Sequence, residues 1–89
     1  MLSSDLNSRQ RETLRAVFEK PTRAGIRRTA IVALFTGLGA EIEEGSGSRV
    51  GVDLKGKRVV FHRPHPKPTA KKGLIEAVRT FLASAEIKP

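Results

Sequence analysis

Residues 40–66 read AEIEEGSGSRVGVDLKGKRVVFHRPHP, and three short runs in this segment alternate apolar with polar residues. Alternation with a period of two indicates strands that bury one face. A Gly/Ser connection at residues 45–48 separates the first two runs, and Lys55-Gly56 separates the second from the third. Connections this short join neighbouring strands only when the strands are antiparallel. The segment therefore predicts a three-stranded antiparallel sheet.

The Lys55-Gly56 turn also predicts the register of the last two strands, because a two-residue hairpin loop fixes which residues lie opposite each other. In that register Arg49 faces His62 on the polar face of the hairpin. The opposite face carries the apolar residues Val50, Val52, Val59 and Phe61. Residues directly opposite each other have Cβ atoms about 5 Å apart. We therefore expect Arg49 and His62 to be neighbours at the strand ends.

Both flanks of this segment have helical periodicity, with apolar residues recurring three and four positions apart. We expect helices over residues 9–19, from an N-cap at Thr29 to Gly37 or Gly39, and over residues 70–85 after an N-cap at Thr69. The element order is then α-α-β-β-β-α. This order predicts an α+β sandwich in which the helices cover one face of the sheet.

Composition limits the function. The chain has 89 residues, a formal net charge of +8 and a sequence pI near 10.9, which favours a polyanionic partner, nucleic acid before membrane. It has four Phe but no Trp or Tyr, so an aromatic platform for stacking bases is not expected. It has no Cys and only two His, and we expect neither a metal nor another cofactor. No apolar run is long enough for a membrane span, and we expect a cytoplasmic protein.

Three short motifs occur in a specific order between residues 27 and 88. An apolar helix ends in a Gly-containing run at residues 34–39, Gly47-Ser48-Arg49 opens the second strand, and FHRPHP at residues 61–66 precedes a basic helix start. In this order the motifs resemble the HicA (YcfA-like) mRNA interferase toxins of type II toxin–antitoxin systems. Residues 27–89 would be the HicA-like domain, and residues 1–26 a helical extension of the same compact unit.

The resemblance implies a double-stranded-RNA-binding-domain-like α-β-β-β-α fold with an extra N-terminal helix. It also implies metal-independent cleavage of mRNA and neutralisation by a HicB-like antitoxin. The family's catalytic His lies in a Gly-Ser-His motif on the second strand. The matching residue here is Arg49.

Arginine cannot act as a general base, because its guanidinium stays protonated throughout the physiological pH range. It can hold a phosphate through two hydrogen bonds. His62, the expected neighbour of Arg49, is the candidate base or acid, and His65 is a further candidate catalytic residue or RNA contact. Candidate RNA-binding residues surround this pair in the sequence: Ser48, Arg63, Lys67, Lys71 and Lys72.

Two alternatives remain open on the sequence alone. The chain could be a non-catalytic RNA-binding module, because the strand-two His of the family motif is replaced. It could also be a protein-interaction module whose basic face binds an acidic protein rather than RNA.

Overall fold

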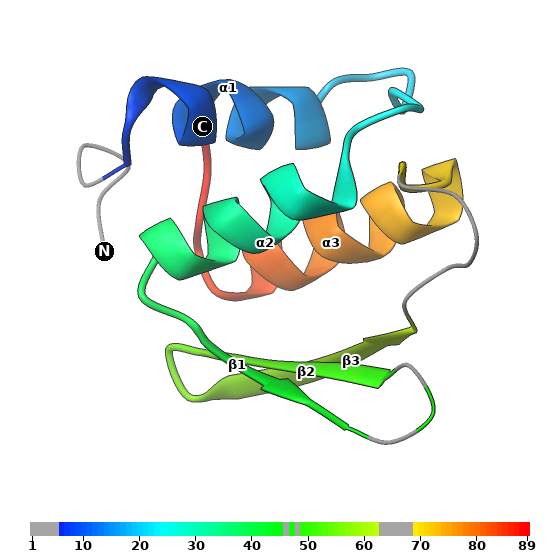
Figure 1. Cartoon of the computed structure of the whole chain (residues 1–89). Coiled ribbons are helices and arrows are strands. Elements are labelled where there is room, and N and C mark those ends of the chain that lie inside the picture. The colour runs from blue at the N-terminus through cyan, green and yellow to red at the C-terminus, as the bar shows by residue number, and fades with distance from the viewer. Residues whose placement is uncertain (1–5, 46, 48, 63–68) are drawn as a thin grey trace.

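The computed structural model describes residues 6–45, 47, 49–62 and 69–89. The described elements, in chain order, are α1 (Ser8–Val17), α2 (Arg28–Gly37), β1 (Glu41–Glu44), β2 (Arg49–Leu54), β3 (Lys57–His62) and α3 (Lys72–Ser84). Helices α2 and α3 lie over the same face of the sheet, and α1, which contacts both, lies on the far side of this helix pair (Figure 1). The other face of the sheet carries no helix of the described chain. The predicted α+β class, with a three-stranded antiparallel sheet, is confirmed.

The strands lie in the order β1-β2-β3, so β1 and β3 are the two edges. The turn between β2 and β3 is formed by Lys55 and Gly56, with φ values of 52° and 78°. Two successive residues with positive φ are the mark of a type I′ turn, whose twist matches that of the flanking strands. Arg49 pairs with His62 in the ladder, and the predicted register is confirmed.

The core lies between the helices and the inner face of the sheet. Phe35 of α2 lies at the centre of this core. Its ring centroid is 6.1 Å from that of Phe61 on β3 and 6.0 Å from that of Phe81 on α3. The largest side chains that are almost completely buried come from all three helices and from β2: Leu14, Val17, Leu34, Leu38, Val52, Ile75, Val78 and Leu82. Among the described helices, none is long and apolar enough to cross a membrane.

Helix α1 approaches α2 closely at Gly37. A Cβ atom at this position would lie 2.6 Å from the Gln10 side-chain oxygen and 2.8 Å from a methyl carbon of Leu6. Gln10 also completes a capping box with Asn7 at the start of α1, and its amide donates to the Ala33 carbonyl of α2 at 3.0 Å. The absence of a side chain at Gly37 therefore lets the start of α1 pack on the end of α2.

The other end of α1 is held by Arg79 of α3. Its guanidinium donates to the carbonyls of Val17 and Glu19 at 2.9 and 3.2 Å, and to the Thr22 hydroxyl at 2.9 Å. A cation at a helix C-terminus satisfies unpaired carbonyls and complements the helix dipole. The Thr22 hydroxyl in turn donates to Glu76 at 3.0 Å. These bonds attach α1 to α3 through residues far apart in the sequence.

The two predicted threonine N-caps are wrong. Helix α2 begins at Arg28 with Arg27 as N-cap, and α3 begins at Lys72 with Lys71 as N-cap. The cause is a non-local pairing, because Arg27 and Thr69 form an isolated antiparallel bridge. This bridge holds the chain extended immediately before each helix, so that α2 starts just after the bridge and α3 starts three residues after it.

Candidate nucleic-acid interface

Arg49 and His62 lie side by side on the outer face of the sheet. Arg49 is the first residue of β2, His62 is the last residue of β3, and each is exposed. Their neighbours Val50 and Phe61 form the next pair of the ladder and pack against the core. Because successive side chains of a strand point to opposite faces, Arg49 and His62 point away from the core. Opposed Cβ atoms are about 5 Å apart, so one phosphate can contact both side chains.

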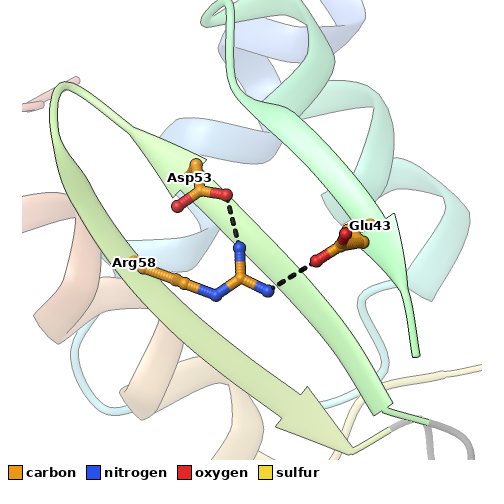
Figure 2. Close-up of polar contacts among 3 residues, drawn as sticks. All are labelled: Glu43, Asp53 and Arg58. Atoms are coloured by element: carbon orange, nitrogen blue, oxygen red, sulfur yellow. Dashed lines mark hydrogen bonds and ion pairs between the residues drawn. The ribbon is translucent and has the colours of Figure 1, made fainter. Parts of the chain in front are cut away.

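The other described arginine on this face is already paired. Figure 2 shows Arg58 of β3 reaching across β2 between Asp53 and Glu43. Its guanidinium hydrogen-bonds Asp53 and lies 2.8 Å from the Glu43 carboxylate. The path is open because residue 51 is glycine, and a Cβ there would lie 2.5 Å from an Arg58 nitrogen. The hydrogen bond to Glu43, with the negative charge of Asp53, raises the pKa of Arg58.

The outer face therefore has two different ends. At the turn end, Arg58 is neutralised by two carboxylates. At the opposite end, neither Arg49 nor His62 forms an ion pair with any residue in the described part of the chain. An unpaired arginine beside a histidine is free to bind an incoming anion, so this second end is the candidate site.

Two helix N-termini meet at the same end of the molecule. The Arg27–Thr69 bridge and a 2.8 Å hydrogen bond from the Ala70 amide to the Ile26 carbonyl hold the entries to α2 and α3 together. Neither helix has a side-chain cap, and Lys71 and Lys72 at the start of α3 are exposed. The helix dipoles add partial positive charge to that of the lysines. This arrangement extends the positive potential from the sheet to the helix layer.

An apolar groove opens between the helix layer and the inner face of the sheet at this end. It is bordered by His62 and by Arg28, the first residue of α2. The Arg28 Nε atom is buried and has no hydrogen-bond partner in the described part of the chain. The rest of the lining is apolar: Ile31, Val32, Phe35, Ile42, Val50, Val52, Phe61, Leu74 and Val78.

The structure describes some of the site residues that the sequence predicts. Arg49, His62, Lys71 and Lys72 lie at the same end of the molecule, as the groove and the bridge between the helix entries show. The remaining candidates lie outside the described residues: Ser48, Arg63, His65 and Lys67. No group of three or more residues able to hold a metal occurs in the described ranges.

Arg28 is a site residue that sequence reasoning missed. The helix expected from an N-cap at Thr29 leaves Arg28 outside it, whereas Arg28 is the first residue of α2 and borders the groove. Its position three residues before Ile31 and four before Val32 is the signal that could have placed it on this face.

The fold and the site define a small basic α+β domain with exposed cations, Arg49, Lys71 and Lys72, at the open end of a sheet that helices cover on one face. This chain belongs to the HicA toxin family: the family model described as HicA toxin of bacterial toxin–antitoxin matches residues 28–87. The match begins at the first residue of α2 and ends shortly after α3, so α1 precedes it. No curated protein and no solved structure matches the chain.

Proposed function

We propose that this toxin binds mRNA and cleaves it without a metal, with His62 as the proton-transfer residue and Arg49 as the phosphate clamp. The observation that carries the proposal is the pairing of these two residues across β2 and β3. The family motif has a histidine where this chain has Arg49. The histidine of this chain, His62, lies on the adjacent strand, directly opposite Arg49.

The reaction that suits these groups uses the ribose 2′-hydroxyl as nucleophile. His62 takes the 2′ proton, the 2′ oxygen attacks phosphorus, and the bond from phosphorus to the 5′ oxygen breaks. The leaving 5′ oxygen takes a proton from a general acid, for which His65 is the sequence candidate. The products are a 2′,3′-cyclic phosphate and a 5′-hydroxyl end. Arg49 would stabilise the charge that develops on the phosphate oxygens in the transition state.

The distribution of charge favours an approach of RNA from the β3 and α3 side. Lys71 and Lys72 are exposed at the start of α3 and can contact phosphates. The further candidate contacts are Ser48, which precedes β2 in the sequence, and Arg63 and Lys67, which lie between β3 and α3. The opposite edge strand, β1, is acidic, with sequence EIEE. This strand carries no lysine or arginine that could contact a phosphate.

The proposed partner that neutralises the toxin is a HicB-like antitoxin. Membership of a toxin–antitoxin family supports a protein partner of this kind. The second candidate function is RNA binding without cleavage, and the observation that favours it is Arg49 itself, because arginine at the motif position cannot act as a base.

Expression in growing cells, followed by sequencing of RNA 5′ ends, tests the proposal. Wild type should arrest growth and generate new 5′-hydroxyl ends, whereas His62→Ala should do neither, at equal protein levels. If His62→Ala still cuts at the same sites, the assignment of His62 is wrong. If neither protein cuts although wild type binds RNA, the non-catalytic function is correct.

A further inference from the structure

We infer that the groove beside His62 binds an apolar side chain from an acidic segment of a protein partner. The inference deepens the proposed function and rests on it in one respect, because it takes the antitoxin to be that partner. The groove lies between α2 and the inner face of the sheet, at the end where the Arg49–His62 pair is located.

The lining of the groove is suited to an aliphatic or aromatic side chain. Ile31 and Val32 of α2, Ile42 of β1 and Leu74 of α3 all contribute to it. Val32 is 43% exposed, and it is one of only two large apolar side chains exposed to this degree in the described part of the chain. A partner that covers Val32 would remove this apolar surface from water, and that burial favours binding.

The basic residues that border the groove favour a negatively charged partner. The buried Arg28 Nε atom has no acceptor among the described residues, and a buried donor without an acceptor is costly. His62 stands at the same border, and Lys71 lies at the start of the neighbouring helix α3. None of these residues forms an ion pair within the described ranges. A carboxylate next to the inserted side chain would meet the positive charge of the Arg28 guanidinium at this border.

The apolar lining favours a protein over a nucleobase as the occupant. A base inserted among Ile31, Val32 and Ile42 would lose water from its polar edge without gaining hydrogen-bond partners there. An aliphatic side chain has no polar edge, so its insertion carries no such penalty. RNA phosphates can still contact the same cations from outside the groove.

Occupation of the groove would also bring the partner to the strand end that carries the proposed catalytic site. His62 belongs both to the groove and to the pair with Arg49. A segment inserted beside it competes with RNA for the same positive surface. The partner would therefore prevent RNA binding directly, without a change in the fold.

Methyl-selective NMR on the purified full-length chain tests the inference with three peptides: acetyl-EELEE-amide, acetyl-EESEE-amide and acetyl-QQLQQ-amide. EELEE should shift the methyl signals of Ile31, Val32 and Ile42. It should bind at least about tenfold more tightly than EESEE, because the Leu side chain is buried only in the first complex. Loss of the negative charges in QQLQQ should also weaken binding.

Three variants test the location of the site. Val32→Glu should abolish the EELEE shifts, whereas Ala33→Glu, the same change on an exposed neighbouring residue of α2 that does not line the groove, should preserve them. Arg28→Gln should remove the preference for EELEE over QQLQQ, with the fold of each variant checked by circular dichroism.

The inference is overturned if EELEE and EESEE bind equally, or if neither shifts the groove methyls. It is also overturned if oligouridylate shifts these methyls and EELEE does not, since the groove would then be a nucleobase site. None of these results depends on RNA cleavage. A failure of the proposed ribonuclease activity would appear only in the RNA 5′ ends.

Discussion

Arg49 and His62 face each other at the open end of the β2–β3 hairpin, while Asp53 and Arg58 face each other near its turn. The two pairs lie on the same outer face, because they are separated by two full alternations of the ladder. Arg58 is held by Asp53 and Glu43, whereas Arg49 has no ion pair in the described part of the chain. The sheet thus pairs one arginine with two carboxylates and leaves the other exposed at the opposite end.

Substitutions at Arg49 should separate charge from geometry. Arg49→Gln should lower kcat/KM for RNA cleavage by about 100-fold, the usual effect of losing one group that stabilises transition-state charge. Arg49→Lys should recover part of this loss, because lysine keeps the charge but cannot form two parallel hydrogen bonds. Single-turnover cleavage of an end-labelled RNA measures both variants. Arg58→Gln is the matched control and should change cleavage little; equal losses at both positions would contradict the role of Arg49.

The lysines at the start of α3 should contribute to RNA binding through charge alone. The double variant Lys71→Ala, Lys72→Ala should lower the slope of log affinity against log salt concentration by about 1.5, as expected for two lost phosphate contacts. Fluorescence anisotropy with a labelled RNA at several salt concentrations measures the slope. A double variant at Lys57 and Lys88 removes the same charge elsewhere and should leave the slope unchanged. An identical fall in both double variants would show that RNA binding follows net charge rather than this surface.

A substitution in the turn between β2 and β3 should stabilise the fold. Lys55 has a positive φ of 52°, a conformation that asparagine adopts at lower cost than lysine. Lys55→Asn should raise the free energy of unfolding by about 0.5 kcal/mol and the melting temperature by about 3 °C. Thermal unfolding followed by far-UV circular dichroism suits this chain, which has no Trp or Tyr. Lys55→Val should lower the melting temperature, because a β-branched residue is strained at this φ; a rise would contradict the turn geometry.

Arg79 should account for much of the attachment of α1. Arg79→Ala removes its bonds to Val17, Glu19 and Thr22 and should lower the free energy of unfolding by about 2 kcal/mol. For a domain of this size the melting temperature should fall by about 10 °C. Arg15→Ala is the control, because the Arg15 side chain is exposed on α1 and forms no ion pair within the described residues. Its effect should be within about 0.5 kcal/mol. If the two variants unfold alike, α1 is not held through Arg79.

The sheet and its register follow from local sequence rules. Alternation over residues 49–54 and 57–62 assigns one apolar face, and the Lys55-Gly56 turn allows one register that keeps this face buried. The pairing of Arg49 with His62 is a consequence of those two rules. The positions of the three helices followed in the same way from their apolar periodicity, because period is a property of neighbouring residues.

The exact starts of α2 and α3 and the attachment of α1 needed the tertiary structure. The Arg27–Thr69 bridge, which links residues far apart in the sequence, overrides the capping preference of the nearby threonines. The close approach at Gly37 and the bonds from Arg79 are likewise non-local. Sequence periodicity shows that α1 has an apolar face, but it does not show which surface covers that face.

Local sequence patterns were sufficient for the α+β class, the β2–β3 register and the Arg–His pair on the polar face, because each depends on residues close together in the chain. Which of the described cations remain unpaired depended instead on the tertiary structure. It neutralised Arg58 with a carboxylate from a different strand, and it buried the Arg28 Nε atom at a groove formed by α2, α3 and the sheet. The pairing of a charge depends on what the fold brings beside it, and no local pattern contains that information.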